Sequence, residues 1–225
     1  MKIGILGGGG VGQTLATGLM AKGHDVVIGI RAVTAEALTK PRQQVVPLAD
    51  WQKATGGRVV TMREAAVYGE LVINATHGQS SLEALAAAGA ANLNGKVLID
   101  VANPLDFSAG MPPFIARDYA GPTSLGEQIQ AAYPDAYVVK AFNTIAAAVM
   151  VNPALVPGAH DFILAGNSVV AKATVAGIAR DFGWQHILDL GDIVGARASE
   201  AHLALWVRLW TTTGTPMLNI HVAKA

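Results

Sequence analysis

The sequence predicts an α/β fold built on a doubly wound, mostly parallel sheet, with a variant C-terminal half and a long C-terminal helix. Three observations predict it. A glycine-rich turn joins a short apolar run to a helix-compatible stretch at the N-terminus. Strand-length apolar runs then alternate with helix-compatible stretches along the whole chain, which is typical of βα units. Hydrophobic residues make up 52% of the 225 residues and charged residues only 14%, as expected when helices cover both faces of a buried parallel sheet.

The first unit of the chain carries the strongest motif. An apolar strand is expected at 2–6 and a helix at 13–22, and between them Gly7, Gly9 and Gly12 keep the spacing G-x-G-x-x-G. Between a strand and a helix, this spacing is the dinucleotide-binding fingerprint of a Rossmann-type fold. Its glycines permit a tight turn, a close approach to a pyrophosphate and close packing of the helix. The alternative is a flexible glycine loop that binds no ligand.

The second strand, expected at 25–30, indicates which dinucleotide fits. NAD-binding versions of the fold place a carboxylate near the end of this strand to hold the ribose 2′-hydroxyl, whereas this chain has Ile30 followed by Arg31. A guanidinium pairs well with a phosphate, so the sequence favours NADP(H) over NAD(H). The alternative is that Arg31 is a solvated charge at the end of a strand.

The remaining elements continue the alternation. Further strands are expected at 58–62, 70–75, 96–101, 136–142, 161–165 and 185–190. Further helices are expected at 34–39, 48–54, 63–68, 80–88, 124–133, 143–149, 169–182 and 196–212. Residues 105–122 read as a Gly- and Pro-rich surface loop of a length that is often functional, and the apolar stretch 217–222 can close against the core. We expect a single NADP-binding domain over 1–225, with a dinucleotide-binding core at 1–150 and a C-terminal extension at 151–225 that completes a second-substrate pocket.

Composition argues against several other classes of protein. The net charge is zero, so nothing favours nucleic acid or an anionic membrane as a partner. The chain has no cysteine, hence no disulfide and no thiolate metal site, and its histidines show no metal-ligand spacing. No apolar run approaches the roughly eighteen residues of a membrane span, and the first apolar run is a strand rather than a signal peptide. We expect a cytoplasmic protein.

The longest expected helix carries both an apolar stripe and charges. Trp206 and Trp210 are four residues apart and share one face of the helix, which suits the core, a homodimer contact or the edge of a second pocket. Arg197, Glu200 and Arg208 are interpreted as a solvated face of the same helix. A homodimer is the expected assembly.

Polar side chains follow the ends of three neighbouring strands. They are Thr76 and His77, then Asn103, then Asn143. Ligands in open α/β sheets bind beyond the carboxyl ends of the strands, so we expect Thr76, Asn103 and Asn143 in one crevice. His77 could donate a proton there or only cap the following helix. Asn103 could instead be an ordinary turn residue.

Five segments together resemble the NADPH-dependent coenzyme F420 reductase family. They are M-K-I-G-I-L-G-G-G-G-V-G at the start, G-I-R at the end of the second strand, L-I-D-V-A-N-P at 98–104, V-V-K-A-F-N-T-I at 138–145 and D-F-I-L-A-G at 161–166. The resemblance covers nearly the whole chain, and the same domain occurs in the cytoplasmic part of membrane ferrireductases. It implies hydride transfer between NADP(H) and a flat redox carrier, such as coenzyme F420 or a flavin, stacked on the nicotinamide.

The resemblance also implies which residues hold the dinucleotide. Those expected under the pyrophosphate are Gly9, Gly10 and Val11. Those expected beside the adenosine 2′-phosphate are Ile30 and Arg31. The family often has a small hydroxyl residue where Ile30 stands, so one contact to the phosphate would be missing here. Those expected to flank the ribose and nicotinamide are Ala75, Thr76 and His77.

A second set of residues is implied for the carrier. Its floor would be Asn143, Thr144, Ile145 and Ala146, and its rim would be residues 191–197 and 214–217. His77 and Asn143 are the candidates for positioning or proton donation, and some deazaflavin-using members carry a histidine where Asn143 stands. Two other functions stay open from the sequence: reduction of a small carbonyl, imine or quinone by NADPH, and a non-catalytic NADP(H) sensor.

Overall fold

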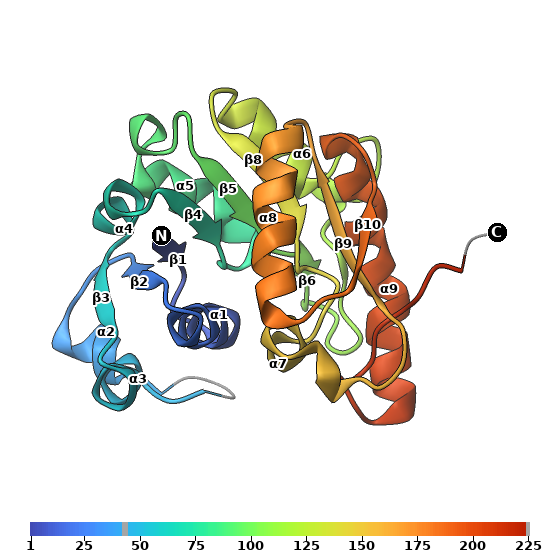
Figure 1. The fold of residues 1–225 in the computed structure, drawn as a ribbon, viewed down its shortest axis with the longest axis horizontal. Helices are drawn as coiled ribbons and strands as arrows, with labels where there is room; N and C mark the ends of the chain where they lie inside the picture. Colours follow the sequence, from blue (N-terminus) through green and yellow to red (C-terminus); the bar gives the residue numbers. More distant parts are fainter. Residues whose placement is uncertain (42–44, 224–225) are drawn as a thin grey trace.

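The computed structural model describes residues 1–41 and 45–223. In this part of the chain, an eight-stranded sheet in the order β10-β9-β8-β5-β4-β1-β2-β3 forms the centre of the molecule (Figure 1). Its strands are β1 (Lys2–Leu6), β2 (Asp25–Ile30), β3 (Arg58–Thr61), β4 (Leu71–Asn74), β5 (Val97–Asp100), β8 (Tyr137–Ala141), β9 (Asp161–Gly166) and β10 (His186–Asp189). From β3 to β8 all neighbours are parallel, whereas β9 runs antiparallel to β8 and parallel to β10. This confirms the predicted doubly wound sheet with its variant C-terminal half.

Helices cover both faces of the sheet, because successive strand residues alternate between two apolar clusters. On one face lie α1 (Gly10–Ala21), α2 (Ala35–Thr39), α3 (Leu48–Thr55), α7 (Ala147–Val151) and α8 (Val169–Phe182). On the other lie α4 (Met62–Tyr68), α5 (Ser81–Ala88), α6 (Leu125–Ala132) and the start of α9 (Ala196–Thr213). Across residues 1–41 and 45–223, none of the helices combines the length and the apolar character that crossing a membrane requires.

Two helices begin elsewhere than the sequence predicts, while the other elements agree to within two residues. Helix α1 starts at Gly10 rather than at 13, because Gly9 is the last extended residue and the Gln13 amide already donates to its carbonyl at 2.9 Å. Helix α7 starts at Ala147 rather than at 143. The reason is that the Ile145 amide donates to the Phe142 carbonyl and closes a turn after β8, and Ala146, the N-cap residue, is still extended (φ −62°, ψ 141°).

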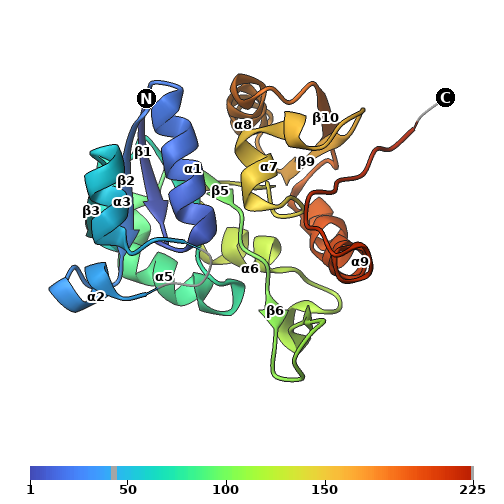
Figure 2. The same ribbon diagram turned by 90° about the horizontal axis from the view of Figure 1, so that it is seen from below.

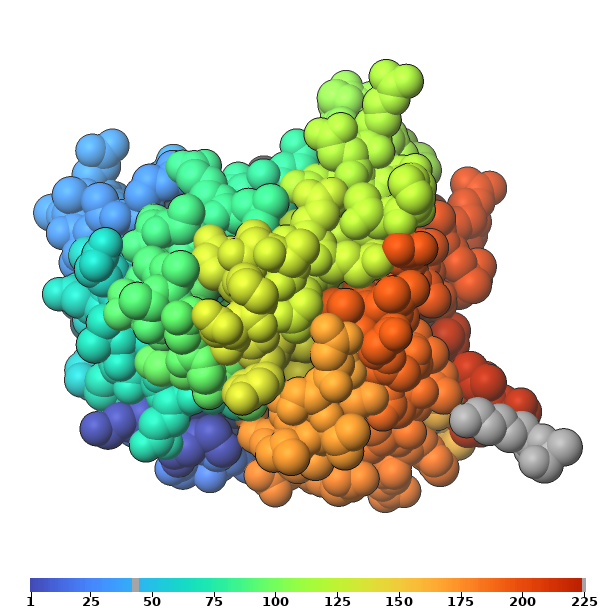
Figure 3. All heavy atoms as spheres, turned by 90° about the horizontal axis from the view of Figure 1, so that it is seen from above, coloured from blue at the N-terminus to red at the C-terminus, as the bar shows by residue number. Residues whose placement is uncertain are grey.

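The expected surface loop at 105–122 contains a small hairpin. Strand β6 (Leu105–Asp106) pairs antiparallel with β7 (Phe114–Ile115). The hairpin projects from the body of the molecule on the side toward which β1 runs (Figure 2), and from above the same segment stands out from the surface in yellow-green (Figure 3). Phe107, Met111 and Phe114 on this arm are about half exposed, so an apolar arm lies near the carboxyl ends of the parallel strands.

The C-terminal stretch 217–222 is held by hydrogen bonds more than by apolar packing. The Asp161 amide at the start of β9 donates to the Ile220 carbonyl at 2.8 Å, and the Asp161 carboxylate accepts from the Val222 amide at 2.7 Å. Met217 is 42% exposed. The stretch therefore lies against the start of β9, as the prediction that it closes against the core requires, but its first residue, Met217, is exposed to solvent.

Candidate functional site

The glycine turn after β1 has the geometry that the fingerprint requires. The Gly7 amide donates to the Gly29 carbonyl at 2.9 Å, and φ at Gly7 is +113°, a conformation open to glycine. A Cβ on Gly12 would lie 2.0 Å from the Gly7 carbonyl oxygen, so α1 packs on the turn too closely for any side chain. A Cβ on Gly9, in contrast, would meet nothing within 4 Å. The turn thus presents bare backbone to open space at Gly9.

The N-terminus of α1 is available to an anion. Gly9 is its N-cap and provides no side-chain cap, and the first turn carries no acidic residue. The free amides of the first helical turn and the helix dipole favour a negative group there. Gly9, Gly10 and Val11 therefore surround a place suited to a pyrophosphate, and the residues present fit a dinucleotide.

Arg31 extends from the end of β2 toward α5. Its Nη2 lies 3.3 Å from Glu83 Oε1, and both side chains are about 70% exposed. Exposed ion pairs of this kind contribute little to stability, so a phosphate could replace Glu83 as the partner of the guanidinium with little loss of stability. Ile30 beside it is buried. Sequence reasoning missed Glu83, which approaches Arg31 only because α5 packs beside the end of β2.

Replacing Arg31 with alanine should weaken NADPH binding about tenfold or more and leave NADH binding within about twofold, because a charge-assisted contact to phosphate contributes roughly 1.5–3 kcal/mol. Fluorescence titration of both cofactors measures the two affinities. Arg58→Ala is the control, since Arg58 also forms an exposed ion pair, with Asp25, at the opposite ends of the strands. Equal losses for NADPH and NADH would show that Arg31 does not contact the 2′-phosphate.

A cavity of about 220 Å³ lies beyond the carboxyl ends of β1, β4 and β5. The residues that line it are Val11, Ala75, Thr76, His77, Val101, Ala102, Asn103, Leu105 and Phe107. Five of these residues were predicted from the sequence to bind the dinucleotide: Val11, Ala75, Thr76, His77 and Asn103. Leu105 and Phe107 come from the hairpin arm and were not expected, although the length of the loop was a signal that it had a function. The cavity adjoins α1 through Val11, so a nicotinamide that follows the pyrophosphate can reach it.

The segment after β8 lies behind this cavity. Asn143 donates through Nδ2 to Asn103 Oδ1 at 3.1 Å and accepts through its carbonyl from Asn103 Nδ2 at 2.7 Å. Asn143, Thr144 and Ile145 are buried, Ala146 is partly exposed, and none of the four lines the cavity itself. Asn143 Oδ1 and Thr144 Oγ1 are buried without a hydrogen-bond partner. Together with the positive φ of Phe142, these unsatisfied atoms mark a strained strand end of the kind that clusters at functional sites.

His77 is exposed at the mouth of the cavity. It occupies the N-cap position of the short 3₁₀ helix Gly78–Ser80, yet its side chain makes no capping hydrogen bond. Its ring lies 6.4 Å from the ring of Phe107, inclined by 48°. The capping alternative is therefore not observed, and the imidazole is free to meet a ligand between the glycine turn and the hairpin arm.

A buried ion cluster lies directly beneath the cavity. Lys140 Nζ is 2.8 Å from Asp100 Oδ2 and 2.9 Å from Glu200 Oε1, and the three side chains are at most 2% exposed. Burial disfavours the charged amine, but the two carboxylates outweigh it and raise the pKa of Lys140. The interpretation of Glu200 as part of a solvated face is therefore wrong. Arg197 and Arg208 are exposed as expected, and Arg197 pairs with Glu127 on α6.

The cluster continues through hydrogen bonds to the polar residues of the cavity. Asp100 Oδ1 accepts from Asn74 Nδ2 at 2.9 Å, and Asn74 Oδ1 accepts from Thr76 Oγ1 at 2.6 Å. A signal for this network is present in the sequence, because Asp100 and Lys140 each interrupt an apolar strand that should be buried on both faces.

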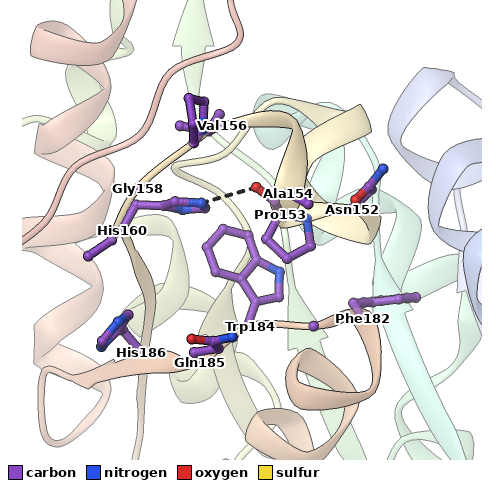
Figure 4. Close-up of a pocket in the computed structure, with 13 residues that line it drawn as sticks. Asn152, Pro153, Ala154, Val156, Gly158, His160, Phe182, Trp184, Gln185 and His186 are labelled. Atoms are coloured by element: carbon purple, nitrogen blue, oxygen red, sulfur yellow. Dashed lines mark hydrogen bonds between the residues drawn. The ribbon is translucent and has the colours of Figure 1, made fainter.

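A larger hollow, of about 510 Å³, lies between the start of β9 and the C-terminus of α8 (Figure 4). His160 packs edge-on against Trp184 at 4.9 Å, and its Nε2 bonds the Pro153 carbonyl at 3.1 Å, as the dashed line shows (Figure 4). The second ring nitrogen contacts Asn219 at 3.0 Å, and Trp184 Nε1 donates to the Met150 carbonyl. The ring nitrogens of His160 and Trp184 in this hollow therefore all have hydrogen-bond partners within the protein.

A doubly wound sheet with this glycine turn defines the class of Rossmann-type dinucleotide-binding proteins. Comparison with known proteins narrows the class. Residues 2–104 match the family described as NADP oxidoreductase, coenzyme F420-dependent. The crystal structure of a provisionally assigned F420-dependent NADP-reductase from Arthrobacter sp. FB24 is 44% identical and superposes over the full length of both chains with a TM-score of 0.93. The chain belongs to the coenzyme F420-dependent NADP oxidoreductase family.

Two curated relatives are similar over part of their length. Metalloreductase STEAP3 of Rattus norvegicus is 32% identical over 201 residues, which are 89% of this chain and 36% of that protein. Glycerol-3-phosphate dehydrogenase [NAD(P)+] of Chlorobium phaeobacteroides is 31% identical over 112 residues, which are 49% of this chain and 34% of that protein. The matched regions thus span about a third of these relatives, and the similarity to STEAP3 includes most of the C-terminal half of this chain.

Proposed function

We propose that this protein transfers a hydride between NADP(H) and a flat redox carrier, such as coenzyme F420 or a flavin. The observation that supports it most is the position of the cavity: it lies between the glycine turn and the ends of β4 and β5, and an aromatic side chain, Phe107, lines its mouth. Membership of an NADP(H)-dependent oxidoreductase family supports the same conclusion.

In this proposal each part of the dinucleotide is bound by a different group of the residues described above. Gly9, Gly10 and Val11 hold the pyrophosphate with backbone amides, and Arg31 pairs with the 2′-phosphate. The loops after β4 and β5 hold the ribose and nicotinamide through Ala75, Thr76, His77 and Asn103. Bound NADPH supplies the hydride at its nicotinamide ring, and the C-terminal extension at 151–225 completes the pocket for the carrier.

The chemistry that remains for side chains is mostly orientation. Two stacked rings at about 3–3.5 Å exchange a hydride without a dedicated acid–base pair, because proximity and alignment supply most of the acceleration. Among the described residues that line the cavity, His77 is the one titratable side chain. In the proposal it exchanges a proton with the carrier, while Asn143 positions Asn103 from behind.

A second candidate function has one observation in its favour. The cavity, at about 220 Å³, is below the usual size of a ligand pocket, roughly 300–1,000 Å³. It therefore suits a small carbonyl, imine or quinone beside the nicotinamide, with His77 as the proton donor. A non-catalytic NADP(H) sensor would bind NADPH and reduce none of these acceptors.

The deciding experiment mixes the purified protein and NADPH with F420, FMN, riboflavin, small quinones, small aldehydes and preformed imines in separate reactions. Loss of absorbance at the nicotinamide band reports hydride transfer. We expect turnover with a tricyclic carrier. Turnover confined to the small acceptors would replace the proposal with the second candidate, and tight NADPH binding without any turnover would identify a sensor.

Phe107→Ala should raise the KM for a tricyclic carrier by about five- to tenfold, since aromatic stacking contributes roughly 0.5–1.5 kcal/mol beyond the area it buries. The affinity for NADPH should stay within about twofold. Steady-state kinetics at saturating NADPH measures the first quantity and fluorescence titration the second. Phe114→Ala is the matched control, because Phe114 is equally exposed on the same hairpin but does not line the cavity. The same KM in both variants would place the carrier elsewhere.

A further inference from the structure

The buried cluster of Lys140, Asp100 and Glu200 joins three elements at the carboxyl edge of the sheet: β8, β5 and α9. A lysine ammonium has three donors and no acceptor. Here the three acceptors are Asp100 Oδ2 at 2.8 Å, Glu200 Oε1 at 2.9 Å and the Ala102 carbonyl at 2.5 Å. The ammonium is therefore saturated, and its orientation is set by three directional contacts.

The net negative charge of the cluster is stabilised by a fourth element, the N-terminus of α6. Two carboxylates and one ammonium leave one negative charge, and Glu200 places it against the N-terminus of α6, where its oxygens accept from the amides of Leu125 and Gly126 at 3.0 Å each. A helix N-terminus stabilises a negative charge. Glu200 thus connects α9, in the C-terminal half of the chain, to α6 and β8 at once.

The cluster determines the position of two polar groups of the cavity. The backbone of Ala102 is held on both sides, since its carbonyl accepts from Lys140 and its amide donates to Asp100 Oδ1 at 3.2 Å. Asn103 follows directly and lines the cavity. Asp100 Oδ1 also accepts from Asn74, which in turn accepts from Thr76. Thr76 and Asn103 are therefore both tied to one buried carboxylate that Lys140 holds.

Stability alone does not explain such a cluster. A buried ion pair gains little over well-packed apolar residues of the same volume, because desolvation offsets the attraction. What charged partners add is direction and distance, and these contacts lead to the loops after β4 and β5.

We propose that Lys140 is a positioning residue for hydride transfer, acting with Asp100 and Glu200 to hold Thr76 and Asn103 against the nicotinamide. The inference rests on the proposed function for the identity of the bound ring. It assigns to α9 a role in the dinucleotide half of the site, through Glu200.

Two variants and one control test this role. The double variant Lys140→Met with Glu200→Gln removes one positive and one negative charge, so the net charge of the cluster does not change while the contact to Ala102 is lost. The single variant Glu200→Gln keeps an oxygen that can accept from Lys140. The control is Glu127→Gln, which breaks the pair of Glu127 with Arg197. That pair joins the same two helices, α6 and α9, without touching Lys140.

The first readouts need no acceptor. NADPH affinity is measured by titration, and the fluorescence emission of the bound nicotinamide reports the rigidity of its surroundings. For the double variant we expect an NADPH affinity within about threefold of wild type, because the pyrophosphate and 2′-phosphate contacts are intact. We also expect a clear loss of emission from bound NADPH, because Thr76 and Asn103 would hold the nicotinamide less rigidly. The second readout is kcat with the acceptor found for the wild type, which should fall by at least about tenfold in the double variant and about threefold in Glu200→Gln. Glu127→Gln should match the wild type in all three.

A folded double variant with wild-type emission and wild-type kcat would overturn the positioning role. If the double variant does not fold, the single variant Glu200→Gln is the test. Wild-type emission and wild-type kcat in Glu200→Gln would then overturn the positioning role. A wild-type protein that reduces no acceptor would overturn the proposed function while the emission of bound NADPH still decides the role of Lys140. A wild-type protein that binds no NADPH would overturn both.

Discussion

Gly9→Val should abolish NADPH binding, with an affinity at least about a hundredfold lower, while the protein stays folded. A Cβ at this position would have no protein atom within 4 Å, so the backbone leaves room for a side chain there. The backbone there is extended (φ −78°, ψ −172°), which suits a β-branched residue. The added methyl groups would instead occupy the space that a pyrophosphate needs. Titration with NADPH and a thermal melt measure the two effects.

The neighbouring glycine provides a control with the opposite behaviour. At Gly12 an added Cβ would lie 2.0 Å from the Gly7 carbonyl oxygen, so Gly12→Ala should lower the melting temperature itself. If Gly9→Val bound NADPH normally, the turn would not hold the pyrophosphate, and the placement of the dinucleotide would have to change.

Lys140→Met alone should lower the free energy of unfolding by about 3–5 kcal/mol, because Asp100 and Glu200 would remain buried without their counter-charge. Urea denaturation followed by circular dichroism measures this loss. The charge-matched double variant should recover part of it. Lys53→Met is the surface control: its pair with Asp50 is exposed and 3.9 Å long, and its loss should cost under about 1 kcal/mol. A loss as small for Lys140 as for Lys53 would contradict the balance of charges described for the cluster.

The same cluster predicts the direction of a pH effect. The pKa of Lys140 is raised in the folded protein, although burial opposes it, because two carboxylates contact the ammonium. A raised pKa means that the stabilising contribution is complete below the unfolded value, about 10.4, and is lost as the pH rises through the folded value. The difference in stability between wild type and Lys140→Met should therefore shrink only at strongly alkaline pH.

Local sequence was enough to predict the strands and the glycine turn. Buried parallel strands read as short, nearly continuous apolar runs, so the strands expected at 2–6 and 25–30 coincide with β1 and β2, and each of the other six differs by one residue at one or both ends. The spacing of Gly7, Gly9 and Gly12 is also a local property, because the three glycines lie within six residues between one strand and its helix. The fold class followed from these two features.

Tertiary structure alone decided which polar side chains are buried and what they meet. Glu200 has the spacing of a solvated helical residue, and it is buried because Lys140, sixty positions earlier, meets it across the end of the sheet. Phe107 reaches the cavity because it lies on the hairpin of β6 and β7, which follows directly after the loop at the end of β5. The start of α7 depends on a turn that begins at Phe142, which has a positive φ, and this turn has no signal in the sequence around it. By itself the sequence determined the strands, the glycine turn and the fold class, since these follow from patterns within short segments, and the same kind of local reading predicts a 2′-phosphate contact at Arg31. The pairing of Lys140 with charges 40 and 60 positions away depends on strand order, and the pattern of neighbouring residues does not predict which strand ends lie side by side.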